Sequence, residues 1–71
     1  MAELTHEQYD LLERAIADGQ RIAIFRRGTE YMVIPIRLRL SSREAIEAMH
    51  PTTGERLTLF IDEIERFEVV G

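Results

Sequence analysis

YMVIPIRLRL, the sequence of residues 31–40, decides the fold of this chain. Apolar side chains occupy every second position of the stretch: Met32, Ile34, Ile36, Leu38 and Leu40. The positions between them are Tyr31, Val33, Pro35, Arg37 and Arg39. Since successive side chains of a β-strand point to opposite faces, this alternation predicts a strand that buries the first set and exposes the two arginines of the second.

Pro35 lies in the middle of this predicted strand and has no backbone N–H to donate to a neighbouring strand. Proline within a sheet is confined to edges and bulges, so we expect residue 35 to lie at an edge, a bulge or a bend. A strand this long in a small barrel is expected to bend and to belong to two sheets.

The residues before this strand predict a helix at residues 5–18. Thr5 and Gln8 have the spacing of a capping box, and Gly19 suits a left-handed C-cap. The expected buried stripe follows the helical period: Tyr9, Leu12 and Ile16, widened by Leu11 and Ala15.

Short β-rich runs surround the central strand. Residues 21–26 predict a first strand, joined to the central one by a turn around Gly28. Residues 43–49 fit either a strand or a helix, and the turn sequence at residues 51–54 favours a strand paired with residues 56–61. A turn at Asp62 and Glu63 precedes a last strand at residues 64–70, with Phe67 and Val69 facing inward.

These elements predict a mainly β fold, with an N-terminal α-helix at residues 5–18 followed by a five-stranded antiparallel SH3/Sm-like barrel at residues 21–70. A chain of 71 residues is expected to form a single domain, 1–71, with a modest core. It contains no cysteine, which excludes disulfides and cysteine nucleophiles. Its apolar runs are too short for a membrane span, so a soluble cytoplasmic protein without a membrane partner is expected.

Charge is distributed unevenly along the chain. Residues 21–43 carry six arginines against Glu30 alone, whereas the residues on both sides are acidic and bring the net charge to −4. All nine basic residues are arginine, the side chain that binds carboxylates and phosphates through two parallel hydrogen bonds. The predicted contact face for a ligand or single-stranded nucleic acid comprises Arg37, Arg39, Arg26, Arg27 and Tyr31.

The sequence also allows two alternatives to this contact face. The arginines can instead pair across strands with Glu44, Glu47 or Glu30 and form a neutral lattice, and the acidic flanks repel a polyanion. The second alternative is an adaptor that offers an acidic helix surface to a basic protein partner, through Glu7, Asp10 and Glu13 together with Glu3.

No catalytic or metal-binding signature is present. His6 and His50 have no second histidine or cysteine at ligand spacing, so no metal site and no cofactor are expected. The carboxylates between residues 62 and 68 fit the solvated face of a terminal strand better than an acid/base pair. We therefore expect a non-enzymatic binding or regulatory module whose partner is a protein or a small ligand, with single-stranded nucleic acid as the alternative.

Several segments resemble the WYL domain, a small SH3/Sm-like barrel of bacterial transcriptional regulators. The resemblance spans residues 11–70 and rests on Ala15-Ile16 at the helix end, residues 21–25, Pro35-Ile36-Arg37-Leu38 and residues 54–64. It implies a role in sensing ligands or nucleic acid, with Arg37 carried over from the binding face. The Trp-Tyr-Leu tripeptide that names the family would fall at residues 44–46, where this chain has neither Trp nor Tyr. Two arginines of the family are replaced here by Leu57 and Glu63.

A weaker similarity covers the same region. The Tyr9-Asp10 pair and the Asp62-Glu63-Ile64 segment are similar to the small Sm-like modulator of Rho-dependent transcription termination. That family is acidic and acts by occupying a nucleic-acid-binding protein, which implies the adaptor role for this chain.

Overall fold

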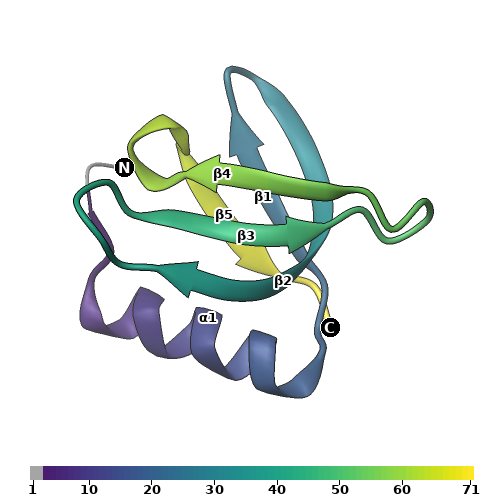
Figure 1. Ribbon diagram of the computed structural model, residues 1–71, viewed down its shortest axis with the longest axis horizontal. Helices are drawn as coiled ribbons and strands as arrows, with labels where there is room; N and C mark the ends of the chain where they lie inside the picture. Colours follow the sequence, from purple (N-terminus) through teal and green to yellow (C-terminus); the bar gives the residue numbers. More distant parts are fainter. Residues whose placement is uncertain (1–2) are drawn as a thin grey trace.

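The computed structural model describes residues 3–71, and it confirms an N-terminal helix followed by five antiparallel strands (Figure 1). Along the chain the elements are α1 (His6–Asp18), β1 (Ile22–Arg26), β2 (Thr29–Arg39), β3 (Ala45–Met49), β4 (Arg56–Phe60), the 3-10 helix η1 (Ile61–Glu63) and β5 (Arg66–Val69). The strands form one sheet in the order β4-β3-β2-β1-β5. Residues 43–49, whose sequence fits either a strand or a helix, therefore contain the strand β3.

The capping box predicted at the start of α1 is present as two hydrogen bonds. The Thr5 hydroxyl accepts from the Gln8 N–H at 3.1 Å, and the Gln8 side chain accepts from the Thr5 N–H at 2.9 Å. Gly19 ends the helix with φ of 65°, a conformation that glycine adopts without a steric cost. These caps explain why the helix runs over His6–Asp18, as predicted.

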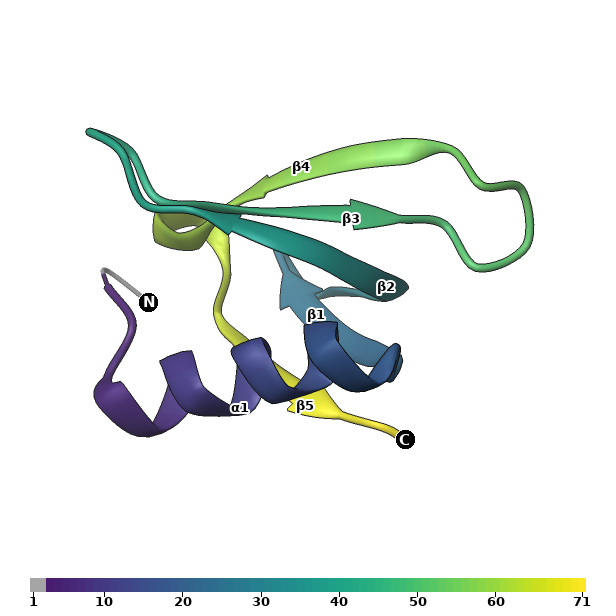
Figure 2. The same ribbon diagram turned by 60° about the horizontal axis from the view of Figure 1, so that its bottom comes forward.

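One face of α1 covers one end of the bent sheet, where the helix contacts β2 and β5, and it lies below β2 in both views (Figures 1 and 2). Leu12 and Ala15 on this face are fully buried. Leu11, which was expected to widen the buried stripe, is 43% exposed. The prediction for Leu11 is wrong because only one side of the helix meets the sheet.

β2 bends and pairs with different strands along its length. Its first part pairs with β1 as far as Val33 opposite Ile22, and its second part pairs with β3 from Ile34 onward. The register shifts between Pro35 and Arg37, so that Ile36 is an extra residue without an opposite partner on β3. The register shift confirms the irregularity predicted at Pro35. β2 joins the two halves of the five-stranded sheet, as predicted for a long strand that serves two sheets.

The predicted core face of β2 is wrong for a physical reason. Before the bulge Val33 and Pro35 are buried, whereas Met32 is 36% exposed. An extra residue shifts the two-residue period of side-chain direction by one, so the two faces exchange roles at the bulge. Beyond it Leu38 packs against the core and Leu40, past the end of the strand, is 49% exposed.

A single cluster of buried side chains joins the helix to both halves of the sheet. Its largest fully buried members are Leu12, Ile22, Ile24, Val33, Ile46, Ile61 and Ile64. Phe67 and Val69 of β5 pack against this cluster, as predicted for the last strand. No helix within residues 3–71 has the length and apolar character needed to cross a membrane.

Candidate anion-binding face

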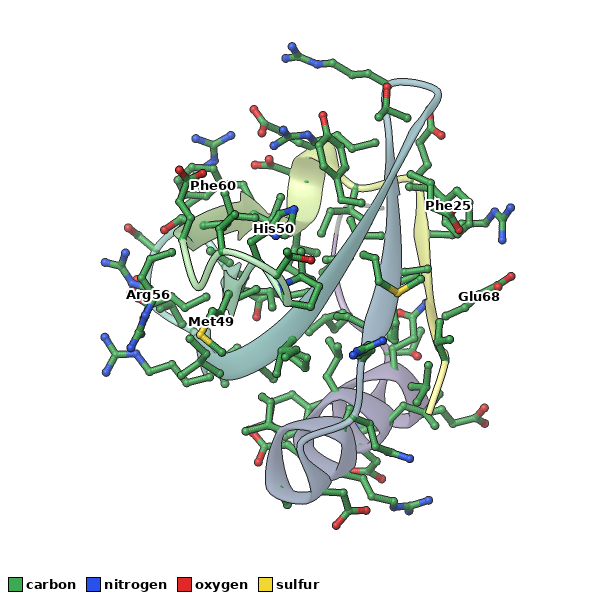
Figure 3. The ribbon with its side chains drawn as sticks, turned by 90° about the vertical axis from the view of Figure 1, so that its right-hand side faces the viewer. Phe25, Met49, His50, Arg56, Phe60 and Glu68 are labelled. Atoms are coloured by element: carbon green, nitrogen blue, oxygen red, sulfur yellow. The ribbon has the colours of Figure 1, made fainter. Side chains whose placement is uncertain are left out.

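The outward face of β2, β3 and β4 gathers charged side chains from all three strands. Ile46 and Ala48 of β3 are fully buried, so the intervening Glu47 points away from the core. Cross-strand neighbours share a face, and Arg37 lies opposite Glu47. In β4, Arg56 lies opposite Met49, and Figure 3 shows both side chains on the same side of the molecule as Phe60.

We call Arg37, Arg39 and Arg56, together with the Glu47 between them, the arginine face. Arg37 donates to both carboxylate oxygens of Glu47, from Nε to Oε1 at 2.7 Å and from Nη2 to Oε2 at 3.3 Å. Arg39 Nε lies 3.3 Å from Oε2 of the same carboxylate. Within residues 3–71, one carboxylate thus serves two guanidinium groups, and the face keeps an excess of positive charge.

Exposure keeps this excess charge accessible. The side chains of Arg37 and Arg39 are 68% and 51% exposed, whereas that of Glu47 is 22% exposed. The acid is therefore held at the sheet surface while the guanidinium groups extend past it. An oxyanion arriving from solvent meets the arginines first, and Arg37 and Arg39 can each offer N–H groups that Glu47 does not use.

The hydrogen bond from Arg37 is the main cause that lowers the pKa of Glu47. Desolvation, the next largest effect, opposes it, and the charges of Arg37, Arg39 and Arg56 lower the pKa further. Because the pKa in the folded state lies below the ordinary value of 4.5, protonation favours the unfolded chain. The stabilising contribution is complete above that value and is lost as the pH falls through the lower folded-state pKa.

Glu47→Gln is therefore expected to remove one component of the acid sensitivity of this fold. Urea titrations over a pH series should show a smaller loss of unfolding free energy between pH about 5 and 3 in the variant than in the wild type. Glu55→Gln is the matched control, since Glu55 makes no ion pair within residues 3–71. A Glu47→Gln variant with the wild-type pH profile would contradict the assigned ion pairs.

The five residues predicted as one contact face lie in two places. Tyr31 packs against the core, and the guanidinium carbon of Arg26 lies 5.0 Å from the centre of its ring. Arg26 also pairs with Glu63 at 3.7 Å, and Arg27 is exposed in the β1–β2 turn. The predicted shared face of Tyr31 with Arg37 is wrong because the bulge at Ile36 lies between them.

The remaining ion pairs of residues 3–71 neutralise their arginines. Arg43 forms two hydrogen bonds with Asp62, at 3.0 and 3.1 Å, and lies 3.3 Å from Glu63. The hydrogen bond from Arg43 holds the pKa of Asp62 below its usual value. Arg66 pairs with Glu68 at 2.6 Å. Of the glutamates proposed as lattice partners, Glu47 alone pairs with Arg37 or Arg39 within residues 3–71.

Aromatic rings near the arginine face are already covered. The guanidinium carbon of Arg43 lies 3.8 Å from the centre of the Phe60 ring, and Arg66 covers Phe25 in the same way on the other half of the sheet. An incoming nucleobase would have to displace Arg43 before it could stack on Phe60. The arginine face thus presents guanidinium groups to solvent, while the neighbouring Phe60 ring is covered by Arg43.

Sequence reasoning missed Arg56 and the central position of Glu47. Arg56, Thr58 and Phe60 occupy alternate positions of β4, a pattern that marks its outward face. The signal was therefore present in the sequence. The register of β4 on β3 was needed to place Arg56 near the Glu47 carboxylate.

The acidic residues of α1 lie on a separate surface. Glu7, Asp10 and Glu13 are all exposed, as is Glu3 just before the helix, and they accompany the exposed Leu11. The negative charge of Glu13 raises the pKa of the Tyr9 hydroxyl. This surface belongs to the helix and shares no ion pair with the arginine face within the described part of the chain.

The two histidines lie apart. His6 is exposed in the first turn of α1, and His50 follows β3, where its Nδ1 accepts from the N–H groups of Thr52 and Thr53 at 3.2 and 3.4 Å. Across residues 3–71, no group of three His, Asp or Glu side chains is arranged to hold a metal ion.

No protein-family model matches this chain, and no curated protein matches it. Its fold and surface define a small mainly β domain with an N-terminal helix, a bent antiparallel sheet and an exposed arginine face. The resemblances to the WYL domain and to the Sm-like modulator stay predictions from the sequence.

Proposed function

We propose that this protein is a non-enzymatic binding module that holds the phosphate backbone of a single-stranded nucleic acid on its arginine face. The observation that carries the proposal is the ratio of charges on that face. Arg37 and Arg39 share the one carboxylate of Glu47, with Arg56 close by. By contrast, Arg26 and Arg66 in the sheet and Arg43 just before β3 are each matched by a carboxylate.

Guanidinium groups bind phosphate oxygens through paired hydrogen bonds. The arginines of this face lie on β2 and on β4, with β3 between them, and such a spread suits a repeating phosphate chain. Because Arg43 covers Phe60, affinity comes from charge more than from stacking. Such binding is independent of base sequence and sensitive to salt. A regulatory role in nucleic-acid-associated processes, of the kind that the WYL resemblance implies, is consistent with this mode of binding.

Nuclear magnetic resonance titration with an oligothymidylate tests where a nucleic acid binds. We expect the largest shifts at the guanidinium signals of Arg37, Arg39 and Arg56, because the N–H groups that Glu47 does not use would exchange water for phosphate. The signals of Arg43 should move less, since Asp62 and Glu63 already occupy its guanidinium. Shifts confined to α1, or no shifts at low salt, would contradict the proposal.

The second candidate function is the acidic adaptor. Exposed Glu7, Asp10 and Glu13 around an exposed Leu11 support it, because a charged rim with an apolar centre is the usual anatomy of a protein contact. A basic protein partner would bind here, and its binding would be insensitive to changes on the arginine face. The same titration separates the two functions by the signals that move.

A further inference from the structure

The first part of β2 has an open backbone edge. Its residues up to Val33 pair with β1, while β3 pairs only with the second part, from Ile34 onward. The β1–β2 turn has two residues, Arg27 and Gly28, so Arg26 and Thr29 form a hydrogen-bonded pair. Hydrogen-bonded and non-hydrogen-bonded pairs alternate along an antiparallel ladder. Glu30 and Met32 therefore belong to non-hydrogen-bonded pairs, and their N–H and C=O groups point away from β1.

The chain beyond β3 does not fill this edge. After Met49 it turns back on itself, with the His50 N–H donating to the Glu55 carbonyl at 2.8 Å and the Gly54 N–H donating to the His50 carbonyl at 2.9 Å. In Figure 1 the β1–β2 hairpin turns upward while the β3–β4 loop extends to the right. The two hairpins thus diverge from the Ile34–Met49 pair.

A cavity of about 370 Å³ lies in this fork. One wall consists of four consecutive β2 residues, Glu30 to Val33, as expected for the edge of a strand rather than one of its faces. The opposite wall is formed by the β3–β4 hairpin: His50, Pro51, Thr52 and Leu57. Tyr31 and Leu57 give the cavity an apolar floor, since both pack against the core.

The charge of Glu30 at the rim of the cavity indicates which side chains an added strand would carry. Glu30 is exposed and makes no ion pair within residues 3–71. A residue opposite Glu30 on an added strand would share its face, where an opposite charge is favourable. Its two neighbours would point to the floor at Tyr31 and Leu57, where apolar side chains are favourable.

We propose that the groove between β2 and the β3–β4 hairpin binds an extended peptide segment that adds a strand to the open edge of β2, with a basic residue opposite Glu30 and apolar residues on either side. This site goes beyond the nucleic-acid function because it lies on the edge and floor of the fork and uses none of the arginine face. Main-chain hydrogen bonds supply affinity in such strand addition, and the alternating side chains supply specificity.

The probe is the blocked peptide Thr-Val-Arg-Val-Thr-Val, titrated into the labelled protein and followed by amide signals. We expect shifts and slower hydrogen exchange at Glu30 and Met32, with smaller effects at Tyr31, whose N–H already bonds to β1. Exchanging the peptide arginine for glutamate should weaken binding by about fivefold or more, and Glu30→Arg in the protein should reverse that preference. The Arg37→Glu/Arg39→Glu variant is the control and should bind the peptide as the wild type does.

Three results would overturn the proposal. Absence of any shift at Glu30 and Met32 at millimolar peptide would show that the edge takes no strand. Equal binding by the same peptide with its arginine amide methylated would exclude main-chain pairing. Shifts at these residues that follow protein concentration without peptide would show that a second copy of this chain occupies the groove.

Discussion

Replacement of Ile46 by alanine is expected to lower the free energy of unfolding by about 2 to 5 kcal/mol. Ile46 is fully buried in β3, the strand at the centre of the second half of the sheet. Removing its outer carbons leaves a cavity between neighbours that belong to the same core cluster. For so small a domain this loss is a large share of the total stability.

Met32→Ala is the matched control for this prediction. The alternation of residues 31–40 assigns Met32 to the core, whereas the structure leaves it 36% exposed and places Val33 inside. Urea unfolding curves should therefore show a loss of less than about 1 kcal/mol for Met32→Ala. Equal losses for Ile46→Ala and Met32→Ala would mean that the faces of the sheet are assigned incorrectly.

The largest functional effect is expected from the double charge reversal Arg37→Glu/Arg39→Glu. Each arginine replaced removes charge-assisted hydrogen bonds to phosphate and adds a repulsive carboxylate, so oligonucleotide affinity should fall by at least about a hundredfold. Fluorescence anisotropy with a labelled single strand measures the loss. Circular dichroism checks the fold, because the reversal also places two acids beside Glu47.

Two further variants distinguish a loss of affinity caused by the arginine face from one caused by the change in net charge. Arg14→Glu/Arg21→Glu changes the net charge by the same amount on exposed residues outside the arginine face and should retain most of the affinity. Arg37→Gln/Arg39→Gln removes the contacts without the added repulsion and should lose binding while keeping the fold. If all three double variants bind alike, the arginine face is not the site of contact.

Much of the fold follows from local signals in the sequence. The Thr5–Gln8 capping box and Gly19 determine the two ends of α1, and Pro35 marks the bulge of β2. These features act within a few residues, so the sequence displays them directly. Local sequence does not distinguish a strand from a helix at residues 43–49. Pairing of β3 with β2 and β4 overrules the helix-forming residues there, and such pairing is a long-range effect.

Local signals do not predict which side chains of β2 point to the core, or which residues come together in the arginine face. Alternation runs unbroken from Tyr31 to Arg39 in the sequence, yet the extra residue at Ile36 exchanges inside and outside halfway along. As a result Arg37 and Arg39 were placed correctly on the exposed side, while Tyr31 was assigned to the wrong neighbours. Arg56 joins the face through the register of β4 on β3, which depends on residues far apart in the chain.

Salt dependence of oligonucleotide affinity tests the central claim most directly. Each phosphate held by the arginine face releases bound counterions, so the logarithm of the affinity should fall linearly with the logarithm of salt concentration, with a slope of about −0.7 per contact. The wild type should show a slope of roughly −2 for three arginines, and the Glu7→Gln/Asp10→Asn/Glu13→Gln variant should bind at least as tightly. Affinity that does not respond to salt, or that disappears with the helix acids and survives the reversal of Arg37 and Arg39, would contradict the account.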